Sequence, residues 1–185
     1  GTPPRVTRSH SADAGRSWTP VEPTELPNPN AAVSVLARRV GDSLVVFNDT
    51  ETGRGNLTLG WAEAASDPAA PLQWRRLARL DGEAGSVPPG MPAADYRRLL
   101  SVGIERVGGF DEARSEAAAL VASATRQLCW GEADAQTCNR EFSYPSLIEG
   151  ADGSVHIFYT WHRARILHVQ VSPQWVAQQQ RGTRP

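Results

Sequence analysis

The chain has 185 residues and a formal net charge of −1, and 40 % of its residues are hydrophobic. This length and composition suit one globular domain, or a small pair, with an apolar core. The 16 Gly and 14 Pro argue against an all-helical bundle, and the six Trp argue against a disordered chain. The near-zero charge gives no electrostatic reason to expect nucleic-acid binding. No apolar run is long enough to cross a bilayer.

The first recognisable feature is the octapeptide Ser-Ala-Asp-Ala-Gly-Arg-Ser-Trp at residues 11–18, which fits the pattern S-x-D-x-G-x-x-W. An Asp side chain can accept backbone N–H bonds across a tight turn, and a Gly two residues later tolerates positive φ. We expect the Trp ring to be buried on the flank of the hairpin. The motif predicts a turn between antiparallel strands in which four residues have structural roles: Ser11, Asp13, Gly15 and Trp18.

Strand patterns follow in both halves of the chain. Short apolar segments separated by turn residues predict strands at residues 33–37, 44–47 and 57–62, and again at 146–148, 155–161 and 166–171. The last two segments are apolar at nearly every position, which predicts a sheet covered on both faces. The overall pattern is mainly β, with a turn every ten residues or so.

Between about residues 84 and 140 the strand pattern is absent. Residues 92–107 place apolar side chains at helical spacing, and Gly108-Gly109 is a suitable C-terminal stop. Asp111 can cap a second helix with one apolar stripe. We expect a helical hairpin packed against the core; exposure of the stripe would instead indicate a docking partner. The stripe comprises Ala113, Ala117, Leu120, Val121, Ala124 and Leu128.

The two cysteines, Cys129 and Cys138, lie at the end of this predicted hairpin. One pair without a nearby His is too few ligands for a zinc site. A local disulfide in an exported protein is the expectation, with two buried thiols as the alternative. Residues 1–8 carry no signal peptide, so a leader would have been removed or would lie upstream. No metal site or cofactor is expected.

The octapeptide resembles the Asp-box, or BNR repeat, of bacterial neuraminidases. Three further stretches resemble a sialidase-like branch, the predicted neuraminidases: residues 26–30, 141–153 and 156–166. The resemblance covers residues 5–83 and 141–176. It implies a six-bladed β-propeller whose sugar site lies at the centre of one face, with Asp-boxes on blade edges away from that site.

A blade of four strands takes roughly 40–50 residues, so the residues outside the helical insertion suffice for about three blades. The expected organisation is propeller blades with the Asp-box at 1–83, a helical insertion at 84–140, a last blade at 141–176 and a tail at 177–185. The remaining half of the propeller is then expected from upstream sequence or from another chain.

Family resemblance also implies a catalytic arrangement. Sialidases use a Tyr nucleophile activated by a Glu, an Asp acid, and three Arg that grip the sugar carboxylate. A neutral phenol suits this role because it is not repelled by an anionic sugar. Tyr144 lies where the nucleophile is expected. Asn28 and Asn30 occupy the region expected to hold the partner Glu, and Asn48 stands where a second Arg is expected.

These residues define a candidate carbohydrate site. Tyr144 is the candidate catalytic residue, and the candidate substrate-binding residues are Asn28, Asn30, Asn48, Arg54, His162 and Arg163. The first hypothesis is a neuraminidase-like exo-glycosidase. The alternatives are a carbohydrate-binding propeller without activity, or a uronate polysaccharide lyase, for which a Tyr/His pair beside Arg is also suitable. A carboxylate or His within reach of Tyr144 would favour catalysis. His156 and His168 are expected to be partly buried strand residues.

Overall fold

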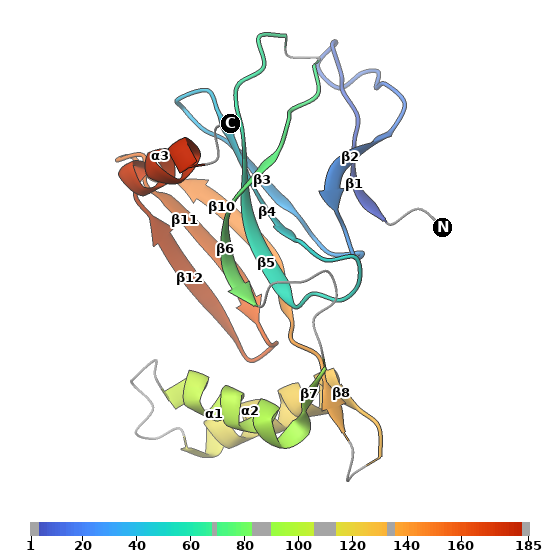
Figure 1. The fold of residues 1–185 in the computed structure, drawn as a ribbon, viewed down its shortest axis with the longest axis vertical. Coiled ribbons are helices and arrows are strands. Elements are labelled where there is room, and N and C mark those ends of the chain that lie inside the picture. The colour runs from blue at the N-terminus through green and yellow to red at the C-terminus, as the bar shows by residue number, and fades with distance from the viewer. Residues whose placement is uncertain (1–3, 68–69, 83–89, 106–113, 133–135, 183–185) are drawn as a thin grey trace.

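The computed structural model describes residues 4–67, 70–82, 90–105, 114–132 and 136–182. Over these ranges the chain is mainly β, as expected, with four antiparallel sheets and three helices. Figure 1 shows the larger sheets side by side, with two helices lying together at one end of the molecule. None of the described helices is both long and apolar enough to cross a membrane.

The first half of the chain forms two sheets. A two-stranded sheet pairs β1 (Arg5–Arg8) with β2 (Glu22–Pro27). A four-stranded meander follows in chain order, with strands β3 (Ser34–Ala37), β4 (Ser43–Asn48), β5 (Asn56–Ala62) and β6 (Arg75–Gly82). Strands β1 and β2 are the antiparallel strands that the octapeptide turn predicts, although no apolar pattern marks them. Strand β6 lies outside the predicted segments, because its Arg-containing sequence carries little hydrophobic alternation.

The four-stranded sheet is covered on both faces. Along β4, Leu44 and Val46 belong to the main hydrophobic core, whereas Val45 and Phe47 pack with Leu26 of β2 in a second cluster. This division follows from the period of two along a strand. Every residue of β5 is buried. Gly60 of β5 is required by packing, because an added Cβ would lie 2.8 Å from a methyl group of Val45.

The last sheet has the order β10 (Phe142–Glu149), β11 (Val155–Trp161) and β12 (Arg165–Val171). The expectation that both 155–161 and 166–171 are covered on both faces is wrong for β12. Its side chains alternate, and Ile166 is 72 % exposed. As the edge strand, β12 packs Leu167 and Val169 against the core and turns its other face to solvent.

The octapeptide forms the connection between β1 and β2. Asp13 accepts hydrogen bonds from the Ser11 hydroxyl (2.8 Å), from the Ser17 backbone N–H (2.8 Å) and from the Ser17 hydroxyl (2.6 Å). These bonds lower the pKa of Asp13 to about 2. Gly15 has φ +86°. The expectation that Trp18 is buried is wrong: it is 63 % exposed, and its indole N–H donates to the Gly15 carbonyl instead.

The middle of the chain contains α1 (Ala93–Glu105) and α2 (Arg114–Leu128). Ala117, Leu120 and Val121 pack against the main core, which removes the reason to expect a docking partner on this stripe. The expected stop at Gly108-Gly109 and the expected cap Asp111 lie outside the described residues. Strands are also present here, contrary to the pattern: the short β7 (Met91–Pro92), β9 (Thr137–Cys138) and β8 (Cys129–Trp130) form one sheet.

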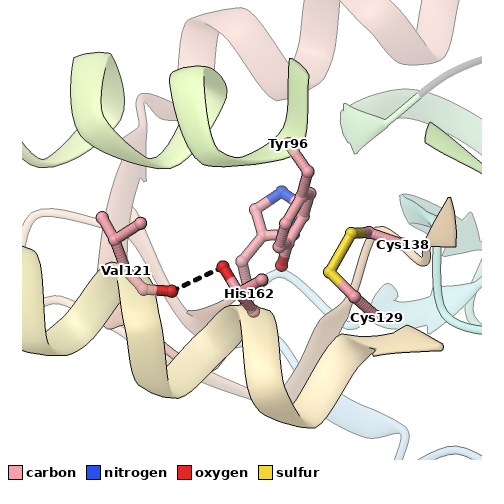
Figure 2. Close-up of a disulfide and its surroundings, with 6 residues drawn as sticks. Tyr96, Val121, Cys129, Cys138 and His162 are labelled. Atoms are coloured by element: carbon pink, nitrogen blue, oxygen red, sulfur yellow. Dashed lines mark hydrogen bonds between the residues drawn. A yellow bond between two sulfur atoms is a disulfide. The ribbon is translucent and has the colours of Figure 1, made fainter. Parts of the chain in front are cut away.

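A disulfide joins Cys129 and Cys138, which are directly paired across β8 and β9 (Figure 2). It ties the end of α2 to the segment that leads into β10. The segment expected to be a tail begins within a third helix, α3 (Pro173–Gly182), whose Val176 is fully buried. A two-residue strand carries too little periodicity to be seen in sequence, and α3 is rich in Gln rather than in apolar residues.

Candidate functional site

Tyr144 sits at a β-bulge in β10. The register of β10 with β11 shifts between Ser143 and Ser146, so Tyr144 and Pro145 occupy the irregular stretch. Pro145 cannot donate to the ladder, which is why it is tolerated here. Tyr144 has φ +53°, although residues that precede a proline favour extended backbone. Its side chain is nevertheless presented to solvent, since the residue is 63 % exposed.

The turn between β11 and β12 places two adjacent side chains on opposite sides. His162 and Arg163 both have positive φ, at +51° and +55°. His162 is buried, at 1 % exposure, whereas the Arg163 side chain is 41 % exposed. Two consecutive left-handed residues suit a tight hairpin connection, so the turn geometry aims Arg163 outward.

Glu141 connects these two segments. Its carboxylate is largely buried, and the Arg163 Nε lies 3.0 Å from each of its oxygens. The Arg54 Nη1 lies 3.8 Å from the same carboxylate, and the Ser143 hydroxyl donates to it at 3.0 Å. This pairing raises the pKa of Arg163 above its usual value. One carboxylate therefore holds two guanidinium groups in place.

Arg54 comes from the loop between β4 and β5, and it reaches three parts of the site. Its guanidinium carbon lies 5.7 Å from the centroid of the Tyr144 ring, within cation–π range. Its Nη2 donates to the Asn30 carbonyl at 3.1 Å. Its backbone carbonyl accepts the Phe142 N–H at 2.8 Å. The exposed surface of the site thus consists of Arg54, Tyr144 and Arg163.

His162 and Tyr96 lie on the buried side of Glu141. The Tyr96 hydroxyl and the Glu141 backbone N–H lie 3.2 and 3.3 Å from the His162 Nδ1. Because both groups can donate, we assign Nδ1 as the acceptor of a neutral imidazole. Burial, with the nearby positive charges of Arg140 and Arg165, lowers the pKa of His162 to about 3. Figure 2 shows Tyr96 extending from α1 toward His162.

The structure therefore corrects the assignment of His162 to the sugar-binding set, because no surface of its ring is open to a ligand. Asn48 is corrected for the same reason. It is 1 % exposed, and its amide donates to the backbone carbonyls of Asn56 and Phe142, at 3.1 and 2.9 Å. Asn48 thus joins the four-stranded sheet to β10, which is a structural role.

The other two asparagines lie in the loop between β2 and β3. The Asn28 side chain accepts the Ala31 N–H at 2.7 Å and so stabilises the loop before β3. Asn30 is exposed, has φ +60°, and meets Arg54 through its backbone carbonyl. Among the described residues, the Tyr144 ring contacts the Arg54 guanidinium, and its hydroxyl makes no hydrogen bond.

A pocket of about 280 Å³ lies next to the arginines. It is lined on one side by Arg54, Glu141 and Arg163, and on the other by residues of the helical insertion, including Gln127 and Trp130. Arg163 spans the two sides, because its Nη1 donates to the Gln127 side chain at 3.2 Å. Tyr144 does not line the pocket, and Arg54 is the residue that connects the two, because it lines the pocket and contacts the Tyr144 ring.

Sequence reasoning missed Glu141, Gln127 and Trp130. The role of Glu141 could not be predicted from local sequence, because its partners are distant. Arg54 lies 87 residues upstream and Arg163 lies 22 residues downstream. A usable signal existed: Glu141 is the first residue of the stretch, residues 141–153, that resembles sialidases. Within the described ranges, no group of three or more His, Cys, Asp or Glu residues could hold a metal ion.

Chemically, the exposed part of the site suits an anion. Arginine offers five N–H donors in a planar fork that matches a carboxylate. Arg54 and Arg163 each use some of these donors for protein contacts, and the remainder can face a ligand. The exposed Tyr144 ring and hydroxyl add an apolar face and a polar group next to them.

Comparison with known proteins supports one family. A family model described as a BNR repeat-like domain matches residues 2–157, and the chain therefore belongs to this family. The predicted membership of the BNR repeat family is thus confirmed. No curated protein matches the chain.

Proposed function

We propose that this BNR repeat-like chain forms blades of a sialidase-like β-propeller that binds an acidic sugar through its carboxylate. The proposed contacts are Arg54 and Arg163 with the sugar carboxylate, and Tyr144 with the sugar ring. The observation that carries this proposal is the shared anchoring of both arginines by one buried carboxylate, next to an exposed tyrosine.

The anchoring supports binding because it lowers the entropic cost of holding two long side chains in place for a ligand. Glu141 also neutralises only part of the local positive charge, since two guanidinium groups face one carboxylate. Asn28 and Asn30 stand at the rim of this surface, where Asn30 can add a side-chain contact. The proposed remainder of the ring, from further sequence or another chain, would cover the open side of the site.

Catalysis is the second candidate, and the backbone of Tyr144 favours it. A non-glycine residue with φ +53° before a proline is strained, and such strain is concentrated at functional sites. In a neuraminidase-like exo-glycosidase, Tyr144 would attack the anomeric carbon. Its proton would pass to a general base contributed by the rest of the propeller. A uronate lyase would use Tyr144 as a base instead, and a binding-only protein would use it as a platform.

The test measures binding of the full chain to N-acetylneuraminate and galacturonate by titration calorimetry, with neutral galactose as reference. We expect one of the acids to bind more tightly than galactose. Arg54→Ala should weaken that binding by about tenfold or more, through loss of a charge-assisted contact. Arg16→Ala, an exposed arginine in the octapeptide turn, is the matched control and should change nothing. Equal affinity for both acids and galactose would contradict the proposal.

Catalysis is tested separately with the completed propeller. Sialoside and uronate polymers are supplied, and Tyr144→Phe is compared with the unmodified protein. Loss of turnover with retained sugar binding would support a chemical role for the hydroxyl. A protein that binds the sugar but turns over neither substrate is a binding module.

A further inference from the structure

One wall of the pocket beside Arg54 is supplied by the helical insertion. Gln127 lies in the last turn of α2, and Trp130 belongs to the short strand β8. Both come from the helical insertion. The insertion therefore contributes directly to the surface next to the proposed acidic-sugar site, rather than only packing against the core.

Trp130 is the exposed aromatic residue of this wall. It is 51 % exposed, although a Trp usually buries most of its large apolar surface. Its backbone is fixed, because Trp130 pairs with Thr137 across β8 and β9 and follows the disulfide-bonded Cys129 directly. An exposed aromatic ring on a rigid element is a suitable binding platform, since little entropy is lost when a ligand stacks on it.

The position of the pocket relative to Tyr144 indicates what would stack there. Arg54 both contacts the Tyr144 ring and lines the pocket. A sugar whose carboxylate is held by Arg54 and Arg163 would therefore have the pocket next to it. At about 280 Å³, the pocket is at the small end of ligand sites, which suits one or two sugar rings.

We propose that Trp130 binds the second sugar of the glycan, the one linked to the acidic residue, by stacking against the apolar face of its ring. Gln127 holds Arg163 in position at the boundary between the two sugars. The disulfide between Cys129 and Cys138 fixes the backbone next to Trp130 at the wall of the pocket. This inference rests on the proposed function, because binding of the acidic sugar is what would direct the rest of the glycan toward the helical insertion.

The experiment compares a single acidic sugar with its longer form: N-acetylneuraminate with 3′-sialyllactose, and galacturonate with trigalacturonate. Affinities are measured by titration calorimetry for the full chain. Trp130→Ala should weaken binding of the longer sugar by about tenfold and leave the single sugar within about twofold. Trp18→Ala, which removes another exposed tryptophan, is the matched control and should change neither affinity.

Two further variants separate stacking from a general structural effect. Trp130→Tyr retains an aromatic ring and should preserve part of the affinity for the longer sugar. The double variant Cys129→Ser/Cys138→Ser should weaken the longer sugar selectively, as Trp130→Ala does. Circular dichroism of each variant checks that the fold is retained.

The outcomes distinguish this inference from the proposed function. If the single acidic sugars bind and Arg54→Ala weakens them, but Trp130→Ala leaves the longer sugar unchanged, the stacking role is wrong and the acidic-sugar site stands. Equal weakening of both forms would place Trp130 against the acidic sugar and would also overturn the inference. If no acidic sugar binds better than galactose, both proposals fail.

Discussion

Two tyrosines lie on opposite sides of Glu141, and their surroundings differ completely. Tyr96 is fully buried against His162, and it contacts the edge of the imidazole ring. Tyr144 is exposed beneath Arg54 and has a strained backbone. The backbone of Glu141 bonds to the buried His162, whereas its carboxylate holds the exposed arginines.

The difference shows how burial assigns roles to chemically similar residues. On the buried side, desolvation keeps both groups neutral: it raises the pKa of Tyr96 and lowers that of His162. Their hydrogen bond then stabilises the junction between α1 and the last sheet. On the exposed side, the Tyr144 ring remains free to meet a ligand. A Tyr/His pair near Arg is therefore not evidence for a lyase here, because this His is on the buried side.

The largest expected effect is on stability and comes from removing Tyr96 on the buried side of Glu141. Tyr96→Ala should lower the free energy of unfolding by about 3–5 kcal/mol, since it leaves a cavity and removes the partner of His162. Tyr144→Ala is the matched variant and should change it by no more than about 0.5 kcal/mol, because its ring is exposed. Urea unfolding followed by tryptophan fluorescence measures both. Similar losses in the two variants would show that the contrast between the tyrosines is wrong.

A second prediction concerns pH. Because the folded pKa of His162 is about 3, below the ordinary 6.5, the unfolded chain binds more protons between these values. His162 should therefore reduce stability as the pH falls from 6.5 toward 3, by up to about 1.4 kcal/mol per pH unit, and have no effect above 6.5. Urea unfolding of the native protein and of His162→Gln, measured from pH 4 to 7, isolates this contribution.

The Gln variant keeps an acceptor but cannot be protonated, so its stability should depend less steeply on pH. If the two proteins have parallel pH profiles, His162 is protonated equally easily in the folded and unfolded states. That result would remove the electrostatic difference between the two sides of Glu141.

The smallest effect concerns the exposed side and has the opposite sign. Tyr144→Gly should raise the free energy of unfolding by about 1 kcal/mol, because Gly adopts φ +53° without steric cost. The same variant should lose affinity for the acidic sugar. Thermal unfolding and sugar titration on one preparation test both parts. A loss of stability in this variant would mean that the Tyr144 ring contributes packing rather than storing strain.

Much of the framework was visible in local patterns. Apolar runs predicted β4, β5 and β11, and helical spacing predicted both helices of the insertion. In contrast, β1, β2 and β6 contain Arg or Pro and only a few buried residues, so no apolar pattern marks them. Their strand structure depends on pairing with neighbouring strands. The exposure of Trp18 was missed because the octapeptide specifies a turn but not what lies beside it.

Only part of the candidate site could be predicted from the sequence. Tyr144, Arg54 and Arg163 were found from resemblance and residue type, whereas Asn48 and His162 were placed in the binding set and are buried. Local sequence does not report which side of a turn is open to solvent. Glu141 and Trp130 became part of the site only when distant segments met, since each acts through residues far away in the chain.

By itself, the sequence determined the family, the β-rich character and the hydrogen-bonded turn of the octapeptide, because these depend on periodicity and short-range contacts. Only the tertiary structure decided that Glu141 joins two arginines, that His162 is neutral and enclosed, and that the insertion reaches the pocket. These outcomes depend on burial and on contacts between segments distant in sequence, and no local pattern encodes either one.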